Sequence, residues 1–111
     1  MNKLFVVILF CGCLTLAGRI ALADGSAAAG KEKSEDCATC HGEDGAGDGD
    51  TIPAIAGISA EDFKQAMAAY KDGTRTDSRM MVKMGKKLSP KDVADLAAYY
   101  ATLEKQPQAV E

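Results

Sequence analysis

Apolar side chains recur at helical spacing in two stretches of the chain, each with its own start and stop signals. The first stretch begins at Ser59, a residue type that caps helix N-termini, and ends at Gly73, a type that terminates helices. Its apolar face carries Phe63, Ala66, Met67 and Tyr70. This spacing predicts a helix over residues 59–73 whose apolar side packs into a core.

The second stretch lies near the end of the chain. Ser89 is placed as its cap, Pro90 at its first position and Asp92 three residues after the cap. Pro107 lies beyond its end. Its apolar face carries Val93, Leu96, Ala97, Tyr100 and Leu103. These features predict a last helix over residues 89–103.

A third helix is predicted over residues 27–39, where helix formers and alternating charges occur without proline. Gly30 costs about 1 kcal/mol against alanine inside a helix, which indicates a close crossing with another element. Four glycines between Gly42 and Gly49 then predict a loop. No alternating β-branched run follows residue 23, so the predicted fold class is all-α.

The opening residues have the pattern of a secretory signal. A basic start at Lys3 precedes an apolar run, and Ala-Leu-Ala ends at Ala23. Residues 1–23 are therefore predicted to be a signal peptide and residues 24–111 the mature domain, without a membrane span. Two alternatives remain: a permanent membrane helix, against which Arg19 interrupts the apolar stretch, and lipidation at Cys11 or Cys13.

Length and charge limit the possible functions. The chain has 111 residues, enough for one domain, and its 16 acidic residues exceed its 13 basic ones. Loss of Lys3 and Arg19 with the signal would make the mature chain more acidic, which argues against nucleic-acid binding. A mature chain of this size with no tryptophan has a small core, and an additional apolar body would help to stabilise it.

The sequence Cys37-Ala-Thr-Cys40-His41 has the C-x-x-C-H spacing of a covalent c-type haem site. Two cysteines on one helical turn suit thioether bonds to adjacent vinyl groups, and the next residue then lies under the iron. A redox dithiol is one alternative, but it belongs to a βαβ context. A zinc site is another, but the mature chain has no fourth cysteine or histidine for it. The acidic loop after His41 does not meet the glycine and glutamate positions of a calcium loop.

His41 is the only histidine, so a different residue has to fill the sixth position of the iron. Methionine is the soft ligand suited to a low-spin electron carrier. The candidates are Met80, Met81 and Met84, whose ordinary role would be to fill the core.

Several motifs in order resemble the small class I bacterial cytochromes c, especially the c4, c5 and c553 types, from about residue 30 to residue 103. They are "CATCHGEDGAG", "IPAIAG", "YKDGTR", "MMVKMGKKLS" and "DVADLAAYYATL". The resemblance implies a small class I cytochrome c fold, with three to four helices around one covalently attached haem c.

The resemblance also implies roles for individual residues. In that family the methionine ligand precedes the Leu-Ser start of the last helix by a fixed interval. Leu88 and Ser89 thereby indicate Met81, with Met84 as the second choice and Met80 as the third.

Further roles follow from the same resemblance. Gly30 would cross Tyr99 or Tyr100, and a backbone carbonyl in the Ile52-Pro53 loop would accept the imidazole N–H. Arg75 and Arg79 are candidates for binding the haem propionates.

An iron with both axial positions filled has only one-electron exchange available to it, so we expect an electron carrier in the periplasm and not an enzyme. Redox partners would dock at a basic patch, which consists of Arg75, Arg79, Lys83, Lys86 and Lys87, with Lys91 nearby. Two alternatives remain. The chain also resembles the haem subunit of flavocytochrome c sulfide dehydrogenase, and a labile methionine would suit a haem enzyme or gas sensor.

Overall fold

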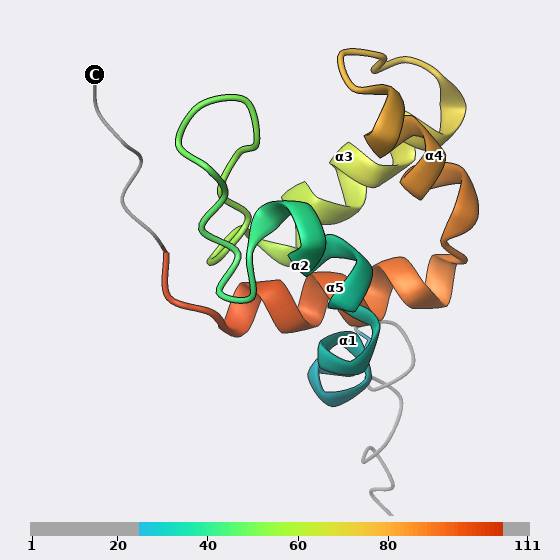
Figure 1. Ribbon diagram of the computed structural model, residues 1–111. Helices are drawn as coiled ribbons and strands as arrows, with labels where there is room; N and C mark the ends of the chain where they lie inside the picture. The colour runs from blue at the N-terminus through green and yellow to red at the C-terminus, as the bar shows by residue number, and fades with distance from the viewer. Residues whose placement is uncertain (1–24, 106–111) are drawn as a thin grey trace, which may run out of the picture.

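The computed structural model describes residues 25–105, which form five helices and no strand. In order these are α1 (Ala27–Lys33), α2 (Glu35–His41), α3 (Ala60–Asp72), α4 (Arg79–Lys87) and α5 (Pro90–Thr102) (Figure 1). The predicted all-α class is therefore confirmed. The predicted signal, residues 1–23, lies outside the described residues. Within residues 25–105 no helix is long and apolar enough to cross a membrane.

The caps of the two strongest predicted helices are confirmed. Ser59 Oγ accepts a hydrogen bond from the Asp62 amide, and Gly73 ends α3 in the left-handed conformation. At the start of α5, Ser89 and Asp92 form a reciprocal capping box in which each side chain binds the other's backbone amide.

The predicted first helix is in fact two helices, which is one reason why the described chain has five helices and not three or four. The break is at Ser34, which ends α1 and starts α2. The Ser34 hydroxyl donates to the Lys31 carbonyl at 2.6 Å, so the side chain competes with the helix for a backbone acceptor. The break separates the helix that packs on α5 from the helix that carries the C-x-x-C-H sequence.

Helix α4 is the other addition to the expected helices. Ser78 caps it by accepting a hydrogen bond from the Met81 amide at 3.2 Å. A glycine inside a run of lysines is not typical of a helix, so the sequence did not predict α4. Gly85 is nevertheless the residue that packs against α3. A Cβ at Gly85 would lie 2.9 Å from the Lys71 amide nitrogen and 3.1 Å from Tyr70 Cβ.

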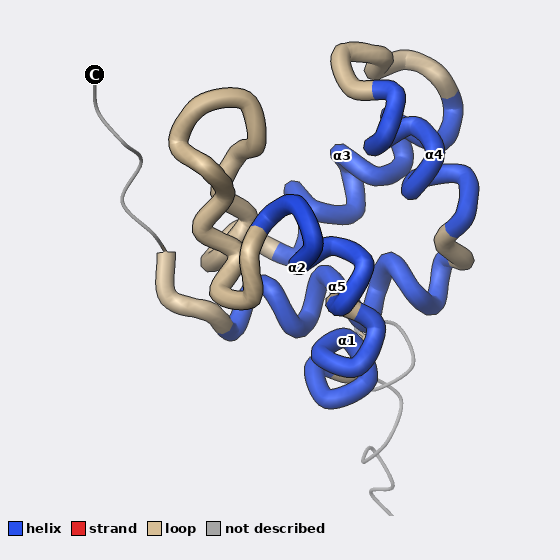
Figure 2. The backbone as a smooth tube through the Cα atoms, in the orientation of Figure 1, coloured by secondary structure: helices blue, strands red, loops and turns tan. Residues whose placement is uncertain are grey.

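The core lies where α3 and α5 meet. Helix α1 packs across α5, α3 packs on both α4 and α5, and a long loop joins α2 to α3 (Figures 1 and 2). The Phe63 and Tyr100 rings stack with centroids 5.8 Å apart. The buried cluster consists of Phe63, Met67, Tyr70, Leu96, Ala97 and Tyr100.

Helices α1 and α5 touch through their backbones at Gly30. A Cβ there would overlap the Asp95 carbonyl and lie 2.7 Å from Tyr99 Cβ. This confirms the crossing predicted with Tyr99 and adds Asp95 to it.

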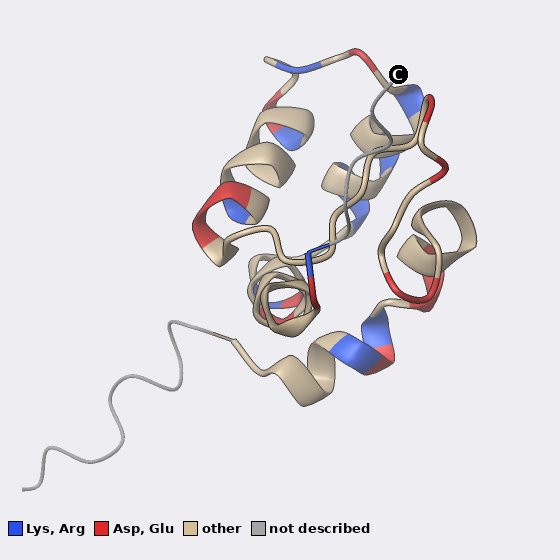
Figure 3. Ribbon diagram, turned by 90° about the vertical axis from the view of Figure 1, so that its left-hand side faces the viewer, with Lys and Arg blue, Asp and Glu red and all other residues tan. Residues whose placement is uncertain are grey.

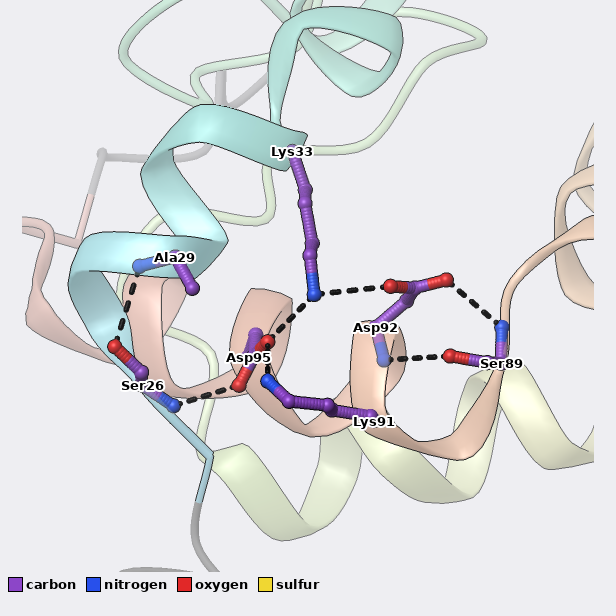
Figure 4. A network of polar contacts seen from close by, with 7 residues as sticks. All are labelled: Ser26, Ala29, Lys33, Ser89, Lys91, Asp92 and Asp95. Carbon is purple, nitrogen blue, oxygen red and sulfur yellow. Dashed lines mark hydrogen bonds and ion pairs between the residues drawn. The ribbon is translucent and has the colours of Figure 1, made fainter.

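The Asp95 side chain ties the same two helices together. It is 1% exposed, and its carboxylate accepts hydrogen bonds from the Ser26 amide at 2.8 Å, Lys33 Nζ at 2.6 Å and Lys91 Nζ at 2.8 Å (Figure 4). Lys33 also pairs with Asp92 at 2.9 Å. These bonds hold the pKa of Asp95 far below its ordinary value, and Lys33 and Ser89 lower that of Asp92 to about 2.

Candidate functional site

Helix α2 presents the C-x-x-C-H residues in a short, separate segment. Cys37 is partly buried against the core cluster, Cys40 is exposed, and His41 is buried at the last position of the helix. All three predicted residues are therefore together on one helix of seven residues, followed by the long loop.

One nitrogen of His41 is already engaged. Its Nδ1 lies 2.8 Å from the Pro53 carbonyl oxygen, and because a carbonyl only accepts, Nδ1 has to carry the proton. This agrees with the carbonyl predicted in the Ile52-Pro53 loop. The bond fixes the ring and leaves Nε2 as the nitrogen with a free lone pair, which is the arrangement typical of a metal-binding histidine.

Hydrogen bonds within the loop hold the Pro53 carbonyl in place. The Gly47 amide donates to the His41 carbonyl at 2.8 Å, and the Asp48 amide donates to the Ile52 carbonyl at 3.0 Å. The Asp48 carboxylate accepts from the Ile52 and Asp50 amides, each at 2.8 Å, and these bonds lower the pKa of Asp48. Asp48 thus stabilises the loop that carries the Pro53 carbonyl.

The surroundings of the thiols do not fit the alternatives to haem. Burial raises the pKa of the Cys37 thiol, whereas a redox dithiol depends on a lowered one. Among residues 25–105 there is no strand from which to build a βαβ unit. The described residues also contain no group of three or more His, Cys, Asp or Glu side chains arranged to hold a metal ion.

The three candidate methionines lie on α4 but not on the same side of it. Met81 and Met84 are partly buried and pack against the core cluster, whereas Met80 is 57% exposed. The burial favours Met81 and Met84 over Met80 as ligands. Burial alone does not distinguish Met81 from Met84.

The helices that carry the two proposed iron ligands are not packed together. Within the described chain α2 contacts no helix backbone other than α1. An exposed ion pair between Lys87 and Asp36, 2.9 Å long, bridges α4 and α2. Apart from this exposed ion pair, the separation leaves room for a cofactor between the two helices.

Apolar side chains around the core also fit a large apolar cofactor. The protein alone leaves many of them only partly buried, as a small core in need of an additional apolar body would. They include Ile55, Ile58, Met81, Val82, Met84, Leu88, Val93 and Leu103. The two thiols and the histidine of α2, together with these partly buried apolar side chains, suit haem.

Two of the five basic residues predicted to form a docking patch, and the nearby Lys91, form ion pairs with carboxylates. Arg75 pairs with Asp77 at 3.1 Å, Lys87 with Asp36, and Lys91 with Asp95. Arg79, Lys83 and Lys86 have no ion pair within residues 25–105 and are exposed at i, i+4 and i+7 on α4. Acidic and basic residues lie on several helices of the described chain (Figure 3).

Sequence reasoning missed the acidic partners of these bases and the polar tie at Asp95. A carboxylate in the middle of a helix is ordinarily exposed, and no sequence signal marked Asp95 as buried. Asp77 was visible in the sequence two residues after Arg75, and this proximity was the available clue to their pairing.

Comparisons with known proteins agree with this site. The family model for cytochrome c matches residues 27–104. Cytochrome c-554(548) of Halomonas halodenitrificans is 42% identical over 82 residues, which cover 72% of this chain and 99% of the relative. Cytochrome c4 of Pseudomonas aeruginosa is 41% identical over 102 residues, 92% of this chain, and the chain spans about half of that relative (49%).

A further relative is the cytochrome subunit of sulfide dehydrogenase from Chlorobaculum tepidum, 35% identical over 77 residues, which cover 69% of this chain and 68% of the relative. The family match and the identities over nearly the whole length of the Halomonas protein decide the classification, and with it the predicted cofactor, haem c. This chain belongs to the cytochrome c family, whose members carry covalently bound haem c and transfer electrons to redox partners.

Proposed function

We propose that this chain is a periplasmic monohaem electron carrier whose iron is ligated by His41 and Met81. The observation that carries the proposal is the hydrogen bond from His41 Nδ1 to the Pro53 carbonyl, which leaves Nε2 available beside two thiols on the same helix. In this proposal the signal peptide, residues 1–23, is removed on export.

Cys37 and Cys40 hold the cofactor covalently in this proposal. Each thiol would hold the haem through a thioether to one vinyl group, with its S–H proton taken up by the neighbouring vinyl carbon. Bound haem supplies one-electron exchange between the ferric and ferrous states. His41, held by Pro53, is a more basic ligand than a free imidazole and favours the ferric state.

Met81 is the proposed sixth ligand. Its partial burial against the core supports this role, and the interval to Leu88 and Ser89 selects it over Met84. With His41 and Met81 both holding the iron, no position would be left for oxygen or peroxide, which supports a carrier in place of a catalyst.

The ligand assignment is tested by optical spectra of the ferric protein. Met81→Ala is expected to abolish the weak far-red sulfur-to-iron charge-transfer band while covalent haem is retained. Met84→Ala is the matched control, because it removes a similarly buried methionine three residues away. If the band survives in Met81→Ala and is lost in Met84→Ala, the ligand is Met84. Absence of covalent haem from the wild-type protein would overturn the proposal as a whole.

The proposed location is tested by cell fractionation and N-terminal sequencing. Export with cleavage after Ala23 is expected to give a periplasmic protein that starts at Asp24. A protein that stays in the membrane fraction with residues 1–23 attached would contradict both the cleavage and the location.

A second function is favoured by the sulfide dehydrogenase relative. In that case the chain would be the cytochrome subunit of an enzyme complex and would receive electrons from a flavoprotein. Purification from its native source separates the two proposals. A flavoprotein that co-elutes in a fixed ratio through size exclusion supports the subunit, whereas elution as a lone small cytochrome supports the mobile carrier.

Redox partners of this carrier are proposed to be acidic and to dock on α4. The exposed bases without ion pairs in the described chain, Arg79, Lys83 and Lys86, attract such a surface. Met80, the exposed large apolar side chain beside them, would then make the close contact. The proposed docking surface is therefore smaller than the predicted patch. It consists of the exposed face of α4, next to the proposed ligand Met81.

A further inference from the structure

Three side chains close the turn between α3 and α4. The guanidinium carbon of Arg75 lies 4.6 Å from the centroid of the Tyr70 ring. Arg75 Nε donates to Asp77 Oδ1 at 3.1 Å, and Nη2 donates to Oδ2 at 3.4 Å. The planar fork of the arginine therefore stacks on one partner and binds the other with two nitrogens.

The third side of this triangle is the electrostatic interaction between Tyr70 and Asp77. Burial, and after it the neighbouring Asp77 carboxylate, raise the pKa of the Tyr70 hydroxyl. The pKa of Asp77 is lowered chiefly by its hydrogen bonds to Arg75. Since Tyr70 is a buried core residue, the triangle anchors an exposed turn to the core.

The beginning of the turn is fixed by backbone contacts as well. The Arg75 amide donates to the Ala69 carbonyl at 3.1 Å. The Asp72 carboxylate accepts from the Thr74 amide at 2.8 Å and from its hydroxyl at 2.7 Å. These contacts fix the backbone of Arg75, from which its side chain binds Asp77.

Helix α4 begins directly after Asp77. Ser78 is its cap and binds the Met81 amide, so the proposed ligand is the third residue after the cap. Further along the helix, Gly85 packs against Tyr70 and Lys71 of α3. Met81 therefore lies between two attachment points of α4, the triangle at Asp77 and the close contact at Gly85.

We propose that Arg75, Tyr70 and Asp77 act as a clasp that fixes the start of α4 and thereby holds Met81 in position as the iron ligand. The inference rests on the proposed function, because it takes Met81 as that ligand. It assigns Arg75 a role other than the predicted propionate contact. Arg75 is a positioning residue that acts through α4.

Competition by imidazole measures how firmly the methionine is held. Added imidazole binds the ferric iron only when the methionine leaves, and loss of the far-red band reports the exchange. An exposed ion pair and a cation–π contact are each modest, and together they are expected to change the equilibrium about tenfold. Arg75→Met removes both contacts and is therefore expected to bind imidazole about tenfold more tightly than the wild type. Asp77→Asn removes the ion pair alone and is expected to bind imidazole about threefold more tightly.

Lys33→Met is the matched control. It removes one positive charge, as Arg75→Met does, and it weakens the tie between α1 and α5, away from α4. Its affinity for imidazole is expected to equal that of the wild type even though its free energy of unfolding falls. Equal tightening in Lys33→Met and Arg75→Met would overturn the clasp, because general destabilisation would then explain both.

Asp77→Asn distinguishes the clasp from a propionate contact. The Asp77 carboxylate would repel an anionic propionate, so it has no direct role there. Tightening in Arg75→Met with wild-type affinity in Asp77→Asn would overturn the proposal. Failure of the ligand assignment is detected separately, since Met81→Ala would then keep the band whatever the clasp variants do.

Discussion

The backbone carbonyl of Asp95 occupies the place where a side chain at Gly30 would begin. No Cβ fits at this point of α1, and Tyr99 Cβ closes the other side at 2.7 Å from the same hypothetical atom. The two helices therefore approach as closely as their backbones allow, and the Asp95 carboxylate then binds Ser26 and Lys33 from either end of α1.

Gly30→Ala is expected to destabilise the protein by about 3 kcal/mol, because the added methyl has to push α1 away from α5. Gly73→Ala is the control. It has a positive φ of 84° but nothing within 4 Å of its Cβ, so only backbone strain of about 1 kcal/mol applies. Denaturant unfolding of the haem-loaded protein measures both. Equal losses of unfolding free energy in the two variants would mean that the close contact between α1 and α5 adds no cost to the substitution at Gly30.

Asp95→Asn is expected to cost about 3 kcal/mol of unfolding free energy, since Lys33 and Lys91 would lose the buried carboxylate that they share. Asp36→Asn breaks the Lys87 pair, whose side chains are both more than 60% exposed, and serves as the comparison. We expect only a small loss there. A loss in Asp95→Asn no larger than in Asp36→Asn would contradict the importance of burial.

Stability should fall steeply in acid. The folded chain lowers the pKa of Asp92 to about 2 and that of Asp95 further, from an ordinary value of 3.8. Unfolding in acid therefore takes up protons, and the stabilisation present above that ordinary value is lost as the pH falls toward 2 and below.

The acid dependence is measured by denaturant unfolding from about pH 5 to about pH 2. Asp92→Asn removes one of the two carboxyls and should flatten the decline. An unchanged slope in Asp92→Asn would be inconsistent with this origin of the acid sensitivity.

Local signals in the sequence predicted α3 and α5 well because their caps and apolar faces agree. The crossing at Gly30 was also predicted, since a glycine inside a helix has a cost that suggests a packing reason. Helix α4 was not predicted, although a cap residue at Ser78 followed by apolar residues at helical spacing, Met81, Met84 and Leu88, is a signal of a helix. The break at Ser34 and the burial of Asp95 depend on contacts between distant segments, which a single sequence does not display.

Gly47→Ala should raise the midpoint potential of the haem by tens of millivolts. Gly47 has a φ of 71°, and a Cβ there would overlap the Ile52 carbonyl and lie 2.7 Å from the Pro53 oxygen. Displacing that oxygen weakens its bond to His41, and a less basic imidazole stabilises the ferric state less.

The potential is measured by redox titration with Gly49→Ala as the control. Gly49 has a φ of 75°, so alanine there imposes similar backbone strain two residues away. Equal shifts in the two variants would show that loop strain, and not the Pro53 carbonyl, sets the potential.

Charge reversal on α4 should slow reduction by an anionic reagent. Lys83→Glu combined with Lys86→Glu is expected to lower the bimolecular rate about tenfold at low salt and to have little effect at high salt. Lys31→Glu combined with Lys105→Glu makes the same charge change on α1 and beyond α5. If both double variants slow the reaction equally, net charge and not the α4 face governs the encounter.

The bond between the Ser26 amide and Asp95 joins positions 69 residues apart. Because α1 makes nearly all of its helix contacts with α5, it has little to pack on until the last helix has folded back onto it. A chain that ended before Pro90 would already display both thiols and the histidine of the haem motif, yet it would lack the closure at Asp95. Completion of this small domain is thus a non-local step of folding, in which the last helix fixes the first.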